Sequence, residues 1–200
     1  MDFLLRTSKL IDALSQRIGA MTLWLVLAAV LISGGNAIVR KLFQTSSNAL
    51  LELQWYLFSA VFLLGAGYAF LKNAHVRIDF VASRFSPRLR ATIDIIGILV
   101  FLLPFCYLIF AQSWTLFVKA WESGEMSQNA GGLIRWPAYL LMPLGMALLG
   151  LQAFSELIKR IAFLRGSIPD PTAHAHGAAS ELEEWAEELA EIEKAPGAGK

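Results

Sequence analysis

The chain has 200 residues, of which 56% are hydrophobic and 16% charged, and its formal net charge is +1. A soluble domain carries about a quarter charged residues, so this composition excludes an ordinary soluble protein. The basic residues lie at the ends of apolar blocks rather than on one soluble face, which excludes a nucleic-acid-binding protein. Since blocks of about 20 apolar residues match the hydrocarbon core of a bilayer, the sequence predicts an all-α integral membrane protein.

Residues 1–165 are predicted to form one membrane domain with four transmembrane helices. The apolar blocks predict spans over about residues 18–39, 50–71, 91–118 and 136–158. Residues 1–17 alternate apolar and charged side chains, which predicts an N-terminal interfacial helix, with a frayed terminus as the alternative. Because no small-residue cleavage site closely follows the first block, we expect that block to remain as a signal anchor.

Residues within the spans predict how the helices bend and pack. Pro104 lies in the middle of the third span, where its missing N–H predicts a kink. Gly65 begins a run of three small residues, a thin point at which a neighbouring helix can pack closely. Asp94 lies one turn inside the third span, and Arg90, four residues earlier, is in position to neutralise it.

Residues 166–200 have a different composition from the rest of the chain. Residues 1–165 hold 15 Lys and Arg against 8 Asp and Glu, whereas residues 166–200 hold 2 against 8. A linker rich in Pro, Gly and Ala leads into a Glu-rich stretch whose apolar residues recur at helical spacing. We therefore expect an acidic C-terminal tail, either solvated or docked on a partner as a helix.

The short-loop basic residues predict the orientation of the spans. The N-terminal lead, the loop over residues 72–90 and the end of the fourth span carry three, five and three Lys or Arg, and the other two loops carry two each. The positive-inside rule then places both termini and the 72–90 loop in the cytoplasm. The loops over residues 40–49 and 119–135 would face outward.

The sequence lacks the patterns that mark an active site. There is no Ser/His/Asp set, no pair of carboxylates within a span, no CxxC pair and no phosphate-binding glycine loop, so we predict neither an enzyme nor a cofactor or metal site. The densest polar cluster is His75, Arg77 and Asp79, for which a structural or docking role is expected.

Polar residues within the spans are also few. Asn36, Glu52, Asp94 and Glu156 all lie toward helix ends, where we expect water or headgroups to reach them. Proteins that move ions or acids themselves place charged or unwound segments at the bilayer midplane. The sequence therefore favours a scaffold for a partner over a transport pathway of its own.

A set of residues in and between the second and third spans follows a recognisable order and spacing, namely Glu52, Trp55, Gly65, Ala66, Asn73, His75, Val76, Arg77, Asp79, Asp94, Gly97 and Pro104. Through them the chain resembles a known family, the small membrane subunit (DctQ) of tripartite ATP-independent periplasmic (TRAP) transporters. The resemblance covers about residues 10–165.

The resemblance implies a multi-pass protein of the bacterial inner membrane that has two protein partners. One is a large multi-span permease that carries an organic acid together with sodium. The other is a periplasmic substrate-binding protein. The small subunit would support the scaffold part of the large one and help to dock the binding protein.

Residue-level hypotheses follow from this resemblance. Glu52 and Trp55 would anchor the outer end of the second span, and Glu122 and Glu125 are candidates for contact with the binding protein. The remaining structural or subunit-interface candidates are Gly65, His75, Arg77, Asp79, Asp94 and Pro104. For Arg77 the alternative is a positive-inside residue and nothing more.

Two other functions are compatible with four spans. A membrane anchor of a redox enzyme would need haem-ligating histidines within the spans, and His75, His174 and His176 all lie outside them. A self-assembling channel would need polar stripes along the pore, which the spans largely lack. The transporter subunit is the preferred interpretation.

Overall fold

The computed structural model describes residues 1–44, 47–73 and 85–169. Its elements in chain order are α1 (Asp2–Phe43), α2 (Asn48–Leu71), α4 (Pro87–Gly97), the π-helical segment η1 (Ile98–Leu102), α5 (Leu103–Ser123) and α6 (Trp136–Leu164). Since α4, η1 and α5 follow one another without a break, these elements form four continuous helices, each long and apolar enough to cross a membrane. The predicted all-α membrane fold is confirmed.

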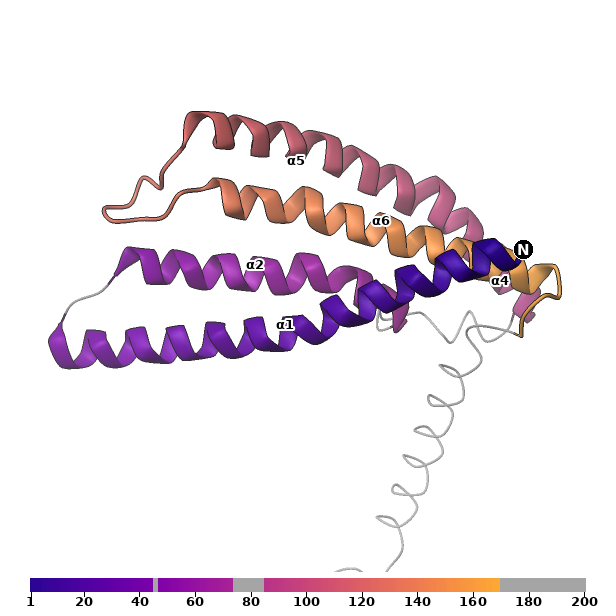
Figure 1. Ribbon diagram of the computed structural model, residues 1–200, viewed down its shortest axis with the longest axis horizontal. Helices are drawn as coiled ribbons and strands as arrows, with labels where there is room; N and C mark the ends of the chain where they lie inside the picture. Colours follow the sequence, from indigo (N-terminus) through magenta and orange to yellow (C-terminus); the bar gives the residue numbers. More distant parts are fainter. Residues whose placement is uncertain (45–46, 74–84, 170–200) are drawn as a thin grey trace, which may run out of the picture.

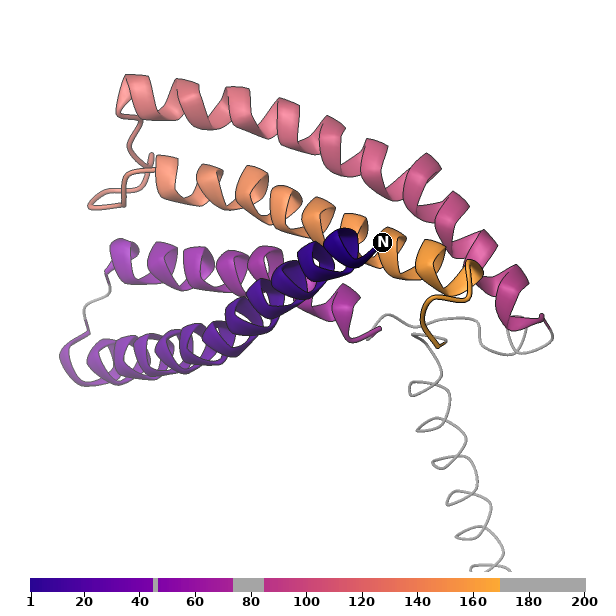
Figure 2. The ribbon, with the colours of Figure 1, turned by 45° about the vertical axis from the view of Figure 1, so that its right-hand side comes forward.

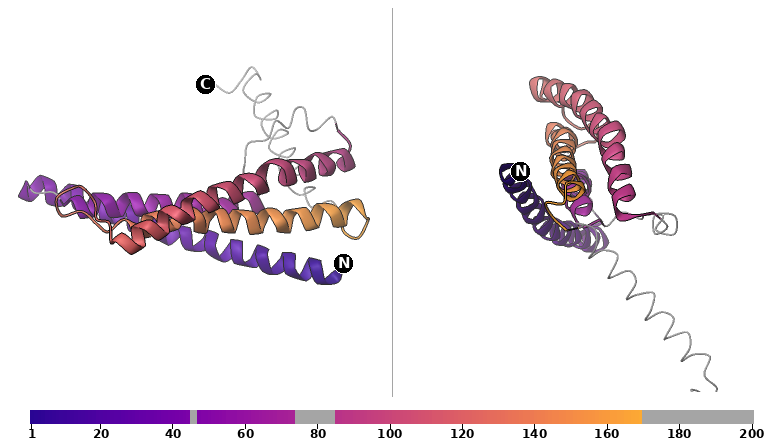
Figure 3. Two further views of the ribbon diagram at one scale, coloured as in Figure 1. Left: turned by 90° about the horizontal axis from the view of Figure 1, so that it is seen from above. Right: turned by 90° about the vertical axis from the view of Figure 1, so that its right-hand side faces the viewer.

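The four helices form one curved layer in the order α1, α2, α6, α5, and toward the N-terminus α1 crosses the end of α2 to pack on α6 (Figures 1 and 3). The α1–α2 and α5–α6 pairs are antiparallel hairpins, and α2 and α6 run parallel where the two hairpins meet (Figure 1). Half of the most apolar part of α6 is buried, against 11% for each of the other three helices. The centre of the layer is therefore α6, and much apolar surface stays exposed on its neighbours.

The layer has two distinct ends (Figure 1). The loop end carries the α1–α2 connection and the segment over residues 124–135. The terminal end carries the N-terminus, the start of α4 and the end of α6.

Helix α1 differs from the short interfacial helix expected before the first span. The N-terminal segment is helical, but it continues into the span as one helix of 42 residues, about 63 Å long. The reason is contact with α6, because the buried hydroxyls of Ser8 and Ser15 bond Ser155 Oγ and Gln152 Oε1, both at 2.7 Å. The N-terminal part of α1 thus packs along α6.

The bend expected at Pro104 involves a π-helical turn. The backbone N–H of Leu103 bonds the carbonyl of Ile98, five residues earlier, just before the proline whose N–H is missing. A π-bulge widens one turn and accommodates this loss. Figure 2 shows the long α4–η1–α5 helix curving along its length.

The closest crossing of α2 and α6 depends on Gly145 rather than on Gly65. A Cβ added at Gly145 would lie 2.8 Å from the backbone oxygen of Leu63, so a side chain there forces the helices apart. A Cβ added at Gly65 would meet only Thr22 Cγ2, at 3.8 Å, which is ordinary contact. Within the thin point expected over residues 65–67, Gly65 has room for a methyl group, whereas Gly67 is buried and a Cβ there would lie 3.4 Å from the Leu148 carbonyl oxygen of α6.

Candidate functional site

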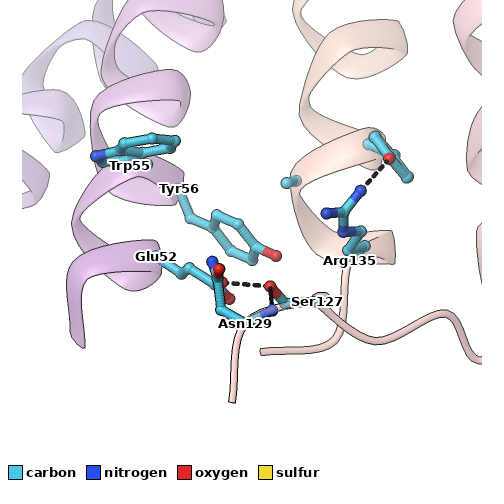
Figure 4. Close-up of a pocket in the computed structure, with 8 residues that line it drawn as sticks. Glu52, Trp55, Tyr56, Ser127, Asn129 and Arg135 are labelled. Atoms are coloured by element: carbon cyan, nitrogen blue, oxygen red, sulfur yellow. Dashed lines mark hydrogen bonds between the residues drawn. The ribbon is translucent and has the colours of Figure 1, made fainter. Parts of the chain in front are cut away.

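Polar side chains gather into two clusters, one at each end of the layer. At the loop end, Glu52 lies in the first turns of α2 and faces the segment over residues 124–135 (Figure 4). Its carboxylate accepts hydrogen bonds from Ser127 Oγ, from Asn129 Nδ2 at 2.8 Å and from the backbone N–H of Leu133 at 2.7 Å. We call these four residues the loop clamp.

The clamped segment is a small hairpin of its own. Met126 and Ile134 form an isolated antiparallel bridge, flanked by backbone hydrogen bonds across the turn. The hairpin is also tied to α2 directly, since Asn48 Nδ2 donates to the Ala130 carbonyl at 2.9 Å and Tyr56 Oη donates to the Ile134 carbonyl at 3.1 Å. The segment between α5 and α6 is thus fixed against α2.

Arg135 is the basic residue nearest the clamp, at the N-terminus of α6. Its Nη1 donates to Tyr139 Oη at 3.3 Å and to Glu125 Oε1 at 3.4 Å. The hydrogen bond with Tyr139, followed by the charge of Glu125, raises the pKa of Arg135 above its usual value, so the residue remains cationic. Arg135, Glu52, Trp55 and the residues around them line a pocket of about 230 Å³ (Figure 4).

Aromatic rings surround the loop end on its α5–α6 side. Trp121 and Trp136 meet edge to face with ring centroids 4.7 Å apart, and Phe117 contacts both. Tryptophan is enriched at the level of lipid headgroups. The pair therefore marks the loop end as one membrane–water boundary.

The second cluster lies at the terminal end and begins with Asp12 of α1. This carboxylate accepts hydrogen bonds from three residues of α6, namely Gln152 Nε2 at 2.9 Å, Ser155 Oγ at 2.8 Å and Lys159 Nζ at 3.1 Å. Lys159 also pairs with Glu156. The contacts fasten the first turns of α1 to the last turns of α6.

Arg160 extends this cluster from α6 to α4. Its Nε donates to Asp94 Oδ2 at 2.9 Å, and its Nη1 donates to Glu156. Arg160 and Glu156 are only 2% and 3% exposed. We call Asp12, Asp94, Glu156, Lys159 and Arg160 the terminal network. Removing one partner of such a buried pair leaves an uncompensated charge, which is strongly destabilising.

The predicted site residues fall into three groups in the structure. Glu52, Trp55, Glu122 and Glu125 lie at the loop end, where Glu122 and Glu125 are exposed. Asp94 belongs to the terminal network, whereas Gly65 and Pro104 lie within the spans and in neither cluster. His75, Arg77 and Asp79 lie outside the described residues.

One expectation about polar residues is corrected. Glu156 was expected to be reached by water or headgroups, but it is buried, because the N-terminal part of α1 covers this part of α6. Asn36, placed in the same group, is also buried at 7% exposure. Asp94 has a partner, Arg160, that lies 66 residues away and that spacing along the chain did not indicate.

Sequence reasoning missed most of the groups that make the two clusters. The missed residues are Asp12, Lys159 and Arg160 in the terminal network, and Ser127, Asn129 and Arg135 at the loop end. The sequence did contain a pattern that indicated Asp12, because Ser8, Asp12 and Ser15 share one helical face. The small, polar character of that face indicated close contact with another helix.

Neither cluster has the composition of a catalytic or metal centre. Within residues 1–44, 47–73 and 85–169, no group of three or more His, Cys, Asp or Glu side chains is placed to hold a metal ion. In both clusters, hydrogen bonds and ion pairs instead connect one helix to another helix or to a loop. Their chemistry is that of helix and loop positioning.

The chain also matches the model of a known protein family. The model described as "Tripartite ATP-independent periplasmic transporters, DctQ component" matches residues 29–163, about two thirds of the chain. No curated protein and no solved structure was found to match. The matched range contains α2, α4, η1 and α5, the second part of α1 and almost all of α6.

Proposed function

Because the chain belongs to the DctQ component family of tripartite ATP-independent periplasmic transporters, we propose that it is the fixed scaffold of a sodium-coupled uptake system for organic acids. The family is a transporter component and not an enzyme, and the tripartite system also contains a large permease and a binding protein. In this proposal the chain supports the large permease in the bacterial inner membrane. It also helps to receive the binding protein on the outer side.

The observation that carries this proposal is the single-layer arrangement of the helices. Away from the crossing of α1 over α6 the layer is one helix thick and encloses little, and large apolar side chains such as Trp24, Phe62 and Phe101 are 71–77% exposed. Lipid tolerates such surfaces, but helix association in membranes depends on close packing rather than on apolar burial. A broad, exposed layer offers a large area for packing against a many-span partner.

Helix α1 supplies a second argument, on its half nearer the loop end. Gly34 and Gly35 have open space above them, so the backbone is accessible to another helix. A helix of the large permease can therefore approach this part of α1 closely.

The orientation that we propose places the loop end in the periplasm and both termini in the cytoplasm. The distribution of Lys and Arg over the short loops supports it. The hairpin over residues 124–135 then faces the binding protein, with Glu122 and Glu125 exposed beside it. Replacing both glutamates by glutamine should reduce uptake while the amount of assembled complex stays the same. Unchanged uptake would contradict this contact.

The docking role of His75, Arg77 and Asp79 remains a proposal from sequence. Arg77→Ala should reduce recovery of the large permease with this chain, and Arg88→Ala in the same basic region is the matched control. Equal recovery of the permease by both variants would leave Arg77 as a positive-inside residue only.

Purification from native membranes tests the scaffold function directly. A tagged chain extracted in mild detergent should bring down a large many-span membrane protein in about equal amount. Recovery of the chain alone as a stable oligomer, with ion conductance in liposomes, would instead establish a channel. The same preparation identifies the neighbouring components and with them the substrate class.

A further inference from the structure

Two pockets lie next to each other at the loop end. The first, of about 230 Å³, lies beside Glu52 and Arg135. The second, of about 430 Å³, lies farther from the loop, between α2 and α5 over the surface of α6. Ala138 and Tyr139 line both, so the two pockets are adjacent. We call the whole the loop-end groove.

Arg135 lies at the mouth of the loop-end groove and has N–H donors that its described contacts do not use. Arginine has five N–H donors. The described contacts of Arg135 both use Nη1, at 3.3 and 3.4 Å, which is long for a hydrogen bond. The Glu52 carboxylate opposite already accepts three hydrogen bonds, and Glu125 is the acid that Arg135 contacts. The guanidinium is therefore available to an anion such as a phosphate.

The inner part of the loop-end groove is mainly apolar. Its lining includes Leu63 of α2, Ile109 and Leu116 of α5 and Met142 of α6, together with the polar residues Ser59, Gln112 and Ser113. Leu63 lies 11 positions beyond Glu52 along α2, which corresponds to about 16 Å, close to half of the roughly 30 Å bilayer core. Since the Trp121–Trp136 pair marks headgroup depth, the groove extends through one leaflet.

The layout of the groove follows that of a phospholipid. A charged mouth at headgroup depth leads to a mainly apolar inner part at the depth of the acyl chains.

From these observations we infer that the loop-end groove binds one phospholipid from the leaflet at the loop end. The phosphate lies at Arg135 and one acyl chain lies between α2 and α5, against Leu63 and Leu116. The acids at the mouth, Glu52 and Glu125, suit a zwitterionic headgroup whose amine lies next to the phosphate. The lipid thereby fills the space that separates two helices held apart by α6.

Native mass spectrometry of the chain extracted in membrane nanodiscs tests the site. The wild-type chain should retain one phospholipid when the bulk lipid is removed. Arg135→Ala and Leu116→Trp should each lower the retained fraction about tenfold, the first by removing a charged hydrogen-bond donor and the second by filling the groove. Arg40→Ala and Leu108→Trp are the matched controls, at an exposed base of the loop end and on an exposed face of α5.

Specific outcomes would overturn the site. The proposal fails if the wild-type chain retains no phospholipid, or if the two controls lose lipid as much as the two groove variants do. It also fails if a photo-crosslinking residue at position 116 captures a polypeptide rather than a lipid. The test does not depend on recovery of the large permease, so its failure is separate from failure of the scaffold function.

Discussion

The two ends of the layer are held together in different ways. At the terminal end, fully or almost fully buried side chains of α6 bond α1 and α4 directly, since Gln152 and Ser155 bond Asp12 and Arg160 bonds Asp94. At the loop end, the Glu52 carboxylate of α2 holds the hairpin over residues 124–135, and this hairpin connects α5 to α6. The terminal network therefore determines helix packing, whereas the loop clamp determines the shape of an outer surface. Loss of the first should affect stability, and loss of the second should affect local order.

Breaking the terminal network at its most buried residue should have the largest effect. Arg160→Met leaves Asp94 and Glu156 without this partner, and we expect the free energy of unfolding to fall by about 3–5 kcal/mol. Unfolding in mixed detergent micelles measures the change. Arg165→Met, at the exposed end of α6, is the control and should change stability by less than about 0.5 kcal/mol. Equal effects of the two variants would show that the buried pairs contribute little.

The seam between α2 and α6 gives a second, smaller effect. Gly145→Ala places a methyl group 2.8 Å from the Leu63 carbonyl oxygen, and such overpacking should cost about 1–3 kcal/mol. Gly65→Ala, its matched control on α2, meets no atom closer than 3.8 Å and should be neutral or slightly stabilising. The same micelle unfolding assay compares the two. A larger loss for Gly65→Ala would mean that the helices cross elsewhere.

Breaking the loop clamp should have the smallest effect on the whole molecule. Glu52→Ala removes the acceptor of the Leu133 N–H and of the Asn129 amide, so we expect the hairpin to lose its attachment to α2 while the rest of the molecule is unchanged. Hydrogen exchange over residues 126–134 should accelerate, while exchange in α6 stays slow. Glu122→Ala removes an exposed acid from the same end and should leave both rates unchanged. Faster exchange throughout α6 would contradict a local role for the clamp.

The apolar runs predicted where the long helices lie, because hydropathy depends only on neighbours in sequence. The predicted spans over 50–71 and 136–158 correspond to α2 and α6, which differ from them by a few residues at one end each. The long first helix was not predicted, because its extension depends on Ser8 and Ser15 meeting residues of α6 that lie 147 and 137 positions away. Amphipathic alternation alone indicated a lipid-facing helix.

The candidate site was predictable only in part. Glu52 was expected at the outer end of its span, but its partners lie 75–81 residues farther along, in a loop with no regular pattern. Glu156 was predicted to be exposed to water because it lies near the end of a span, and this prediction was wrong. Its burial follows from a helix at the far end of the chain, which no local pattern reveals.

The parallel contact of α2 with α6 divides the layer into two hairpins, and each polar cluster joins one hairpin to the other. The loop clamp joins α2 to the loop between α5 and α6, and the terminal network joins α1 to α6. The boundary between the hairpins is thus fastened at both ends, with the tight Gly145 crossing between them. Fastening at two separated points prevents the hairpins from sliding along this boundary or separating at it. Folding about the boundary is opposed by the N-terminal part of α1, which crosses it to pack on α6.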